Sequence, residues 1–183
     1  AVVFTTLQMY RKDRLAYFYD LLKFSVENQI KLGIKFVRGA YMEKERELAE
    51  KYKYADPIYP TKEATDKAFD KAIETAIENL NTVSIFCGTH NLKSILHLCD
   101  LMQRKSYPNN HQNIWFSQLY GMRDNISFEL AKNGFNVAKY LPYGKIRKVM
   151  PYLLRRAEEN SSINTQALEE LQMMEKELKR RLS

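Results

Sequence analysis

The clearest structural signal in the chain is the sequence TVSIFCGTHN at residues 82–91. Its first six residues are rich in β-branched and aromatic side chains, which predicts a buried strand. Polar residues follow at 88–91, and helical periodicity then extends over 92–105. A buried strand, a short polar loop and a helix form the repeating unit of a parallel sheet.

The same unit recurs along the chain. Further strand-like segments lie at 2–7, 34–38, 114–119 and 136–141. Helical periodicity also covers 11–32, 61–80, 124–133 and 145–159. This alternation predicts right-handed crossovers and an α/β fold with a parallel sheet covered by helices.

Capping residues support several of these boundaries. Pro60-Thr61-Lys62-Glu63 is typical of a helix start, and both Lys31-Leu32-Gly33 and Asn133-Gly134 are typical of helix ends. The segment 164–183 predicts a charged amphipathic helix, which either packs on the fold or contacts a partner. The apolar side of that helix carries Leu168, Leu171, Met174, Leu178 and Leu182.

Composition limits the class of protein. The chain has 183 residues, of which 45% are hydrophobic and 28% charged, as in a folded domain with a core. No stretch approaches the roughly 20 apolar residues of a membrane-spanning helix, so we expect none. The two cysteines, Cys87 and Cys99, are too few for a disulfide scaffold and predict a reducing compartment.

The net charge of +7 is compatible with several partners. Solubility, an anionic membrane surface and an acidic ligand all remain open. Many charges alternate in sign, as at 43–47, which predicts a solvated helix face. Nucleic acid is not expected as a partner, because no basic run is interleaved with aromatic residues.

Polar residues gather where the predicted strands end, which is where parallel α/β proteins place their functional groups. Arg38-Gly39-Ala40-Tyr41 combines a glycine that permits a sharp turn or a close ligand contact with a large aromatic side chain. Thr89-His90-Asn91 offers three hydrogen-bonding side chains in a row. No acidic or histidine cluster accompanies His90, so no metal is expected.

Two adjacent arginines, Arg155 and Arg156, lie in the helix that follows the last predicted strand. Neighbouring helix positions cannot both point to the same side. The pair either is solvated and pairs with Glu158 and Glu159, or it captures a carboxylate through the planar guanidinium.

Together these motifs resemble the catalytic domain of the proline dehydrogenase family, over about residues 1–162. The matching stretches, in the family's order, are 38–41, 60–66, 89–91, 119–122, 140–144 and 154–160. The stretches 56–58 and 159–162 resemble mitochondrial-type and monofunctional bacterial members more closely than the long bifunctional proteins.

The resemblance implies a distorted (β/α)8 barrel, of which this chain would supply strands four to eight. Residues 1–162 would form the C-terminal part of the barrel, and 163–183 a helical extension. A complete barrel takes roughly 250 residues. We therefore expect segment 2–7 to pair with segment 34–38 on one side and with a strand of a companion N-terminal half on the other, while 136–141 lacks its barrel-closing neighbour.

The resemblance also implies site residues. Those expected to contact FAD are Gln8, Lys35, Val37, Gly39, Ala40, Thr61, Lys62, His90 and Asn91, together with Ser117 or Gln118. Those expected around the substrate are Tyr41, Leu119, Tyr140, Arg155, Arg156 and Glu159. Lys35, Tyr140, Arg155 and Arg156 would be catalytic.

Three positions depart from the bifunctional bacterial enzymes that the sequence resembles. Lys35 replaces an arginine near the flavin N5, which keeps the charge but loses the fork geometry. Ser117 stands in place of a flavin-contacting glutamine, with Gln118 next to it. Thr61 replaces an arginine near the cofactor phosphates.

The family activity implied is oxidation of L-proline to Δ1-pyrroline-5-carboxylate by hydride transfer to FAD, with a quinone as electron acceptor. The implied compartment is a bacterial cytoplasm at the inner membrane or a mitochondrial matrix at the inner membrane, with contact to the membrane surface. Three alternatives stay open: a hydroxyproline dehydrogenase, a non-catalytic barrel fragment, and an aldolase-type barrel, which would need a catalytic lysine or a metal cluster.

Overall fold

The computed structural model describes residues 3–162 and 178–179, apart from the side chains of 155–162. The chain divides into two compact units, Ala1–Tyr140 and Leu141–Ser183. The first unit carries the whole sheet.

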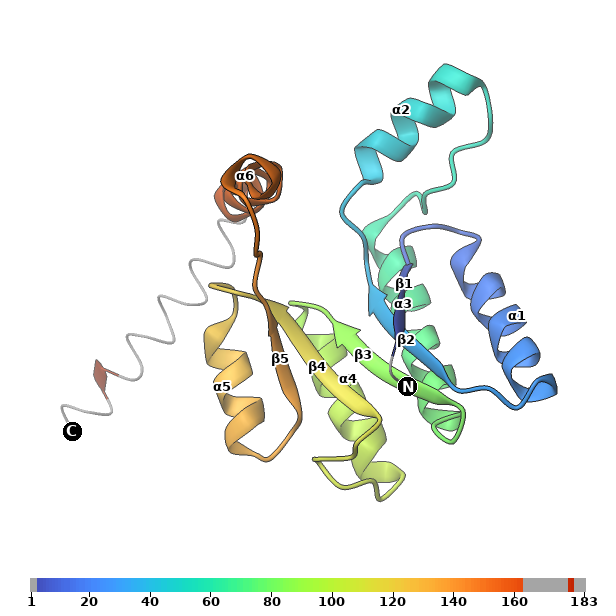
Figure 1. Ribbon diagram of the computed structural model, residues 1–183, viewed down its shortest axis with the longest axis vertical. Coiled ribbons are helices and arrows are strands. Elements are labelled where there is room, and N and C mark those ends of the chain that lie inside the picture. Colours follow the sequence, from blue (N-terminus) through green and yellow to red (C-terminus); the bar gives the residue numbers. More distant parts are fainter. Residues whose placement is uncertain (1–2, 163–177, 180–183) are drawn as a thin grey trace. The chain divides into compact units, whose positions relative to one another are not determined.

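The sheet has five parallel strands in the order in which they occur in the sequence (Figure 1). They are β1 (Phe4–Gln8), β2 (Leu32–Val37), β3 (Val83–Gly88), β4 (Ile114–Leu119) and β5 (Val137–Tyr140). The predicted α/β class and all five strands are therefore confirmed, as is the pairing of β1 with β2. Within the described residues β1 and β5 are the two edges, so the sheet does not close on itself.

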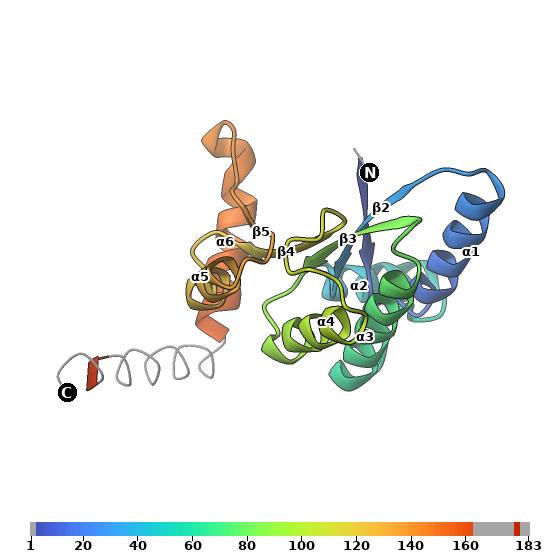
Figure 2. The same cartoon turned by 90° about the horizontal axis from the view of Figure 1, so that it is seen from below.

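Helices cover one face of the sheet. They are α1 (Arg14–Glu27), α3 (Lys62–Glu78), α4 (Leu92–Arg104) and α5 (Asp124–Lys132). Their apolar side chains join one core cluster with Phe36, Ile85, Cys87 and Phe116 of the strands. Successive strand residues alternate between the two faces of a sheet. The intervening residues, such as Lys35 and Phe86, therefore lie on the opposite face. None of these four helices covers that face, which we call the uncovered face (Figures 1 and 2).

Two of the three predicted helix boundaries are confirmed. Thr61 caps α3 by accepting a hydrogen bond from the Ala64 N–H, and Gly134 follows α5 with a left-handed φ of +81°. The end predicted at Lys31-Leu32-Gly33 is wrong, because α1 stops at Glu27 and Gln29 takes the left-handed turn with φ +55°. Residues 30 and 31 lead directly into β2, which already contains Gly33.

A further helix, α2 (Met42–Tyr52), follows the turn after β2 and buries only Ala49. The solvated helix face predicted for 43–47 is thus confirmed. Polar contacts attach α2 to the loop after β1, since Arg11 Nη1 lies 2.7 Å from Glu45 Oε2. Arg11 also forms an antiparallel bridge with Ile58.

The second unit contains α6 (Ile146–Ser162), with Pro151 inside it. The predicted helix at 164–183 lies outside the described residues except for 178–179, and the predicted boundary at 162/163 stays a prediction. Among the described residues, no helix is long and apolar enough to cross a membrane.

Candidate functional site

The uncovered face is organised in rows that run across the strands at equal height, because the parallel register pairs residues of the same face. A row of mostly large side chains comprises Thr6, Lys35, Phe86 and Trp115. The next row toward the carboxyl ends comprises Gln8, Val37, Gly88, Ser117 and Ala138. Leu119 and Tyr140 pair one step further on. Apart from Gln8 at the edge, the middle row, which we call the small-residue row, presents only small or medium side chains.

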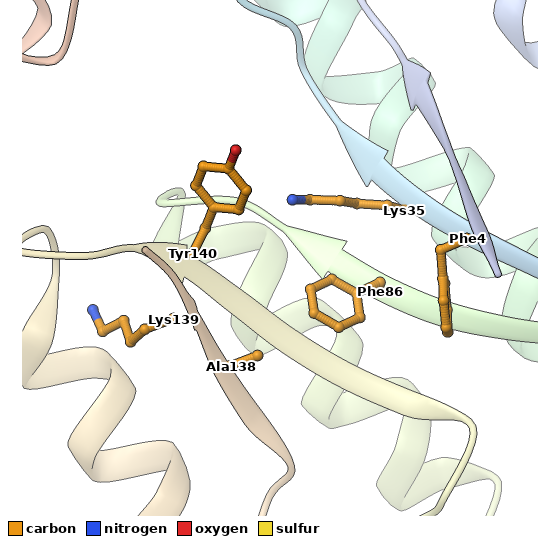
Figure 3. A pocket seen from close by; sticks show the side chains of 6 residues that line it. All are labelled: Phe4, Lys35, Phe86, Ala138, Lys139 and Tyr140. Atoms are coloured by element: carbon orange, nitrogen blue, oxygen red, sulfur yellow. The ribbon is translucent and has the colours of Figure 1, made fainter. Parts of the chain in front are cut away.

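A cavity of about 240 Å³ opens on this face and is lined by Phe4, Lys35, Phe86, Ala138, Lys139 and Tyr140 (Figure 3). The Lys35 ammonium lies 5.1 Å from the centre of the Tyr140 ring and 5.6 Å from that of Phe86. Burial lowers the pKa of Lys35, because desolvation disfavours the charged form. The cavity therefore combines three aromatic side chains with two lysines, of which the half-buried Lys35 places its cation near two of the rings.

Gly88 keeps the space around Lys35 open. A Cβ at Gly88 would lie 2.9 Å from Val37 Cγ1 and 3.2 Å from Lys35 Cε. Any larger residue would therefore displace Val37 or the Lys35 stem. Gly88 thus shapes the site through the space that it leaves.

The neighbours Ser117 and Gln118 point to opposite faces. Ser117 belongs to the small-residue row on the uncovered face. Gln118 is buried on the helix side, where its Oε1 accepts a 2.8 Å hydrogen bond from the Ser127 hydroxyl of α5. Of the two candidates, only Ser117 lies on the face that carries Lys35 and Tyr140.

The turn after β2 requires its glycine. Gly39 has φ +127°, and a Cβ there would come within 1.6 Å of the Tyr10 ring. Tyr10 is itself 3% exposed and pairs its N–H with the Arg38 carbonyl, which extends the β1–β2 pairing. This contact directs the chain through Ala40 to Tyr41, the N-cap residue of α2.

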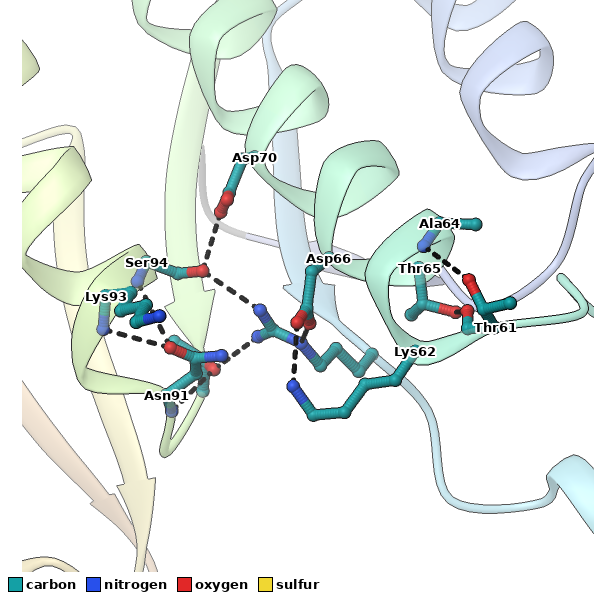
Figure 4. Close-up of polar contacts among 11 residues, drawn as sticks. Thr61, Lys62, Ala64, Thr65, Asp66, Asp70, Asn91, Lys93 and Ser94 are labelled. Carbon is teal, nitrogen blue, oxygen red and sulfur yellow. Dashed lines mark hydrogen bonds and ion pairs between the residues drawn. The ribbon is translucent and has the colours of Figure 1, made fainter.

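The starts of α3 and α4 form a second polar region (Figure 4). Thr61 caps α3, and the Asn91 side chain accepts hydrogen bonds from the backbone N–H groups of Lys93 and Ser94. Lys62 Nζ lies 2.7 Å from Asp66 Oδ2. Cations and the N-terminus of a helix both favour an anion.

Sequence reasoning missed the role of Arg38. Its guanidinium does not face the cavity; instead it binds Asp66 of α3, Thr89 of the loop after β3 and Ser94 of α4. No local pattern could have revealed this, because the partners are 28, 51 and 56 residues away. Lys139 of β5 binds the segment that follows β4 in a similar way. Its Nζ lies 2.6 Å from Asp124 Oδ1 and 2.7 Å from the Met122 carbonyl oxygen.

The structure brings most predicted site residues to the carboxyl ends of the strands. Those on or bordering the uncovered face are Gln8, Lys35, Val37, Ser117, Leu119 and Tyr140. Those in the adjoining loops and helix starts are Gly39, Ala40, Tyr41, Thr61, Lys62, His90 and Asn91. Arg155, Arg156 and Glu159 belong to α6, and their side chains lie outside the described part of the chain.

Known proteins resemble this chain in both sequence and fold. A family model described as proline dehydrogenase matches residues 1–169. Mitochondrial proline dehydrogenase 1 of Caenorhabditis elegans is 38% identical over 186 residues, covering 99% of this chain and 30% of the relative. Hydroxyproline dehydrogenase of Xenopus laevis is 37% identical over 188 residues, covering 98% of this chain and 40% of the relative.

The crystal structure of proline utilization A from Bdellovibrio bacteriovorus inactivated by N-propargylglycine matches with a TM-score of 0.82 at 25% identity. The match covers 90% of this chain and 17% of that chain. This likeness confirms the predicted fold class. The chain spans well under half the length of the worm and frog relatives. Because the family model covers most of its residues, the chain belongs to the proline dehydrogenase family.

Proposed function

We propose that the chain forms the C-terminal part of a proline dehydrogenase barrel. We use the name complete barrel for these residues together with a companion segment that supplies the other strands. The complete barrel oxidises L-proline to Δ1-pyrroline-5-carboxylate. Membership of the family supports this proposal, and the small-residue row is the observation that carries the choice of cofactor.

The row fits a planar ring system. Val37, Gly88, Ser117 and Ala138 lie side by side across four strands and leave a low surface between the larger residues on either side. A flat tricyclic ring needs such a surface, because any long side chain would hold it away from the sheet. FAD would supply a two-electron acceptor for the hydride that leaves proline C5.

Lys35 is proposed to stabilise the negative charge that develops on the acceptor. Its ammonium projects beside the small-residue row and is held between the Phe86 and Tyr140 rings. A cation in a poorly hydrated place acts more strongly on a neighbouring charge than one in bulk water. The same burial that lowers the pKa of Lys35 would therefore strengthen its effect.

The other predicted site residues form two groups, one for the phosphate and adenosine end of the cofactor and one for the substrate. Thr61, Lys62, His90 and Asn91 would hold the phosphate and adenosine end at the starts of α3 and α4. Tyr41, Leu119 and Tyr140 would border the proline ring. Arg155 and Arg156 would bind its carboxylate in a bidentate manner, with Glu159 holding the pair.

The electrons would pass from FAD to a quinone. The worm relative is named mitochondrial, which favours a mitochondrial site at the inner membrane over a bacterial cytoplasm. The net charge of +7 suits contact with an anionic membrane surface.

A second candidate function is oxidation of 4-hydroxyproline, because the frog hydroxyproline dehydrogenase is nearly as similar as the worm proline dehydrogenase. Tyr140 favours proline. Its ring lies at the edge of the cavity, where a 4-hydroxyl group would need room.

The test is quinone reduction by the purified complete barrel with L-proline or 4-hydroxyproline, and chemical trapping of the pyrroline product. We expect faster turnover with L-proline and one pyrroline formed per quinone reduced. Faster turnover with 4-hydroxyproline would select the second candidate. No turnover with either would favour a non-catalytic barrel.

A further inference from the structure

Arg38 occupies an unusual place for a side chain next to a candidate site. Its side chain is only 20% exposed and points among the helices, away from the cavity. The guanidinium carbon lies 4.5 Å from the centre of the Phe69 ring. Burying a cation costs free energy unless it is fully paired. The partners of the Arg38 guanidinium therefore indicate its structural role.

Each guanidinium nitrogen binds a different partner. Nε donates to Asp66 Oδ1 at 2.5 Å, Nη1 to Thr89 Oγ1 at 2.7 Å and Nη2 to Ser94 Oγ at 2.9 Å. These partners belong to α3, the loop after β3 and α4. The fork therefore connects three segments that are far apart in the sequence.

The connected segments are those that carry candidate cofactor contacts. The backbone of Arg38 leads directly into Gly39 and Ala40, and its carbonyl accepts the Tyr10 N–H. Thr89 Oγ1 also accepts a 3.1 Å hydrogen bond from the Asn91 N–H, which fixes the loop that holds His90. One side chain thus links the turn after β2 to the loop after β3, just beyond the last strand pair Val37–Gly88.

Acidic partners complete the network. Ser94 Oγ donates to Asp70 Oδ1 at 2.6 Å, and Asp66 also binds Lys62. Burial alone would raise the pKa of Asp66, but its hydrogen bonds to Lys62 and Arg38 outweigh this and lower it. Asp66 is therefore ionised at neutral pH and holds the guanidinium in place.

We propose that Arg38 is a positioning residue that holds the turn Gly39–Tyr41 and the loop Thr89–Asn91 as one preformed cofactor site. This inference rests on the proposed function, since FAD is the ligand that both segments would contact. A lysine could keep the charge but could not reach three partners in different directions. Position 38 therefore requires the fork geometry of a guanidinium and not only a positive charge.

The test compares Arg38→Lys with Ser94→Ala, which removes one partner, and with Arg104→Met as control. Arg104 forms an ion pair with Asp100 on the exposed side of α4, where its side chain is 71% exposed. All variants are made in the complete barrel. Backbone amide hydrogen exchange at 39–41 and 89–91 is measured without FAD, and FAD affinity is measured by titration with visible circular dichroism of the bound flavin.

We expect Arg38→Lys to speed exchange in both segments together and to weaken FAD binding by about tenfold, the effect of losing one or two partly buried hydrogen bonds. Ser94→Ala should shift both readouts in the same direction by less, and Arg104→Met should shift neither. A lysine that restored wild-type exchange and FAD affinity would overturn the proposal, because charge alone would then suffice.

The two proposals can fail separately. If the wild-type complete barrel binds no FAD, the proposed function and the cofactor part of this inference are overturned together. If it binds FAD but exchange in the two segments is independent of residue 38, the inference is overturned while the function stands.

Discussion

At the scale of single residues, Lys35 has two opposing effects. Burial lowers its pKa in the folded chain below the ordinary value of 10.5, so its charged form costs stability at neutral pH. The same cation is the group proposed to assist reduction of the flavin. Stability and activity therefore conflict at this position, as is common in functional sites.

The first prediction concerns Lys35→Met. Because the folded pKa lies below the unfolded one, the cost of the charge is complete at pH values below the folded pKa and is relieved as the pH rises from the folded pKa toward 10.5. We expect the flavin-free variant to melt at a higher temperature than wild type at pH 7, with a gain that shrinks in alkali. Thermal melts across pH measure this.

Lys23→Met on the exposed side of α1 is the matched control, since the Lys23 side chain is 78% exposed. It should leave the melting temperature unchanged. A Lys35→Met variant that melts below wild type at pH 7 would contradict the burial argument.

Tyr140 is the residue expected to set substrate preference. Tyr140→Ser removes the ring at the cavity edge, so the ratio of kcat/KM for proline to that for 4-hydroxyproline should fall toward or below one. Steady-state kinetics with both substrates measure the ratio. A ratio equal to that of wild type would refute the steric explanation.

Arg155 and Arg156 are expected to bind the substrate carboxylate. Replacing either with Met removes a charge-assisted contact worth roughly 1.5–3 kcal/mol, so KM for proline should rise about ten- to a hundredfold. The apparent KM of each variant checks this. An unchanged KM would remove these arginines from the substrate site.

At the scale of elements, the turn between β2 and α2 depends on the contact of Gly39 with Tyr10. Gly39→Ala would be strained twice, by its φ of +127° and by overlap with the Tyr10 ring. Gly134→Ala at the end of α5 is the control, because it has φ +81° but nothing within 4 Å of the added Cβ.

We expect Gly134→Ala to cost about 1 kcal/mol and Gly39→Ala roughly 3 kcal/mol or more of unfolding free energy. Urea unfolding measures both values. Equal losses of unfolding free energy in the two variants would show that the Tyr10 ring moves aside at no energetic cost.

Most elements could be predicted because their signals are local. The β-branched and aromatic side chains of segment 82–87 predict β3, and the capping residue Thr61 predicts the start of α3. The end of α1 could not be placed, because apolar residues recur at Ile30 and Leu32 while Gln29, a non-glycine, makes the left-handed turn. The hydrogen bonds of this turn run from the Gln29 N–H to the Val26 carbonyl and from the Ile30 N–H to the Ser25 carbonyl, and no glycine marks it in the sequence.

The site was predictable in part for the same reason. The family resemblance identified Lys35 and Tyr140, and the structure places the Lys35 ammonium 5.1 Å from the centre of the Tyr140 ring. Whether Ser117 or Gln118 faces the site depends on strand register, and the partners of Arg38 depend on how α3 and α4 pack. Neither leaves a periodic pattern in the sequence.

At the scale of the whole molecule, the uncovered face of the sheet is the central feature. Its aromatic residues Phe4, Phe86 and Trp115 are only half-buried, whereas α/β proteins normally cover a parallel sheet on both faces. The partners that we propose for β1 and β5 are strands of the companion segment, which would close the barrel over Lys35 and the small-residue row. FAD would then be held between two walls.

The most direct test of this account is a flavin titration of residues 1–183, alone and after co-expression with the N-terminal barrel strands of a family member such as the worm relative. We predict that the chain alone binds FAD poorly and that the combined protein is yellow, with a visible flavin band that L-proline bleaches in the absence of oxygen. A soluble monomer of residues 1–183 that binds FAD fully and oxidises proline, or a combined protein whose flavin proline does not bleach, would contradict the account.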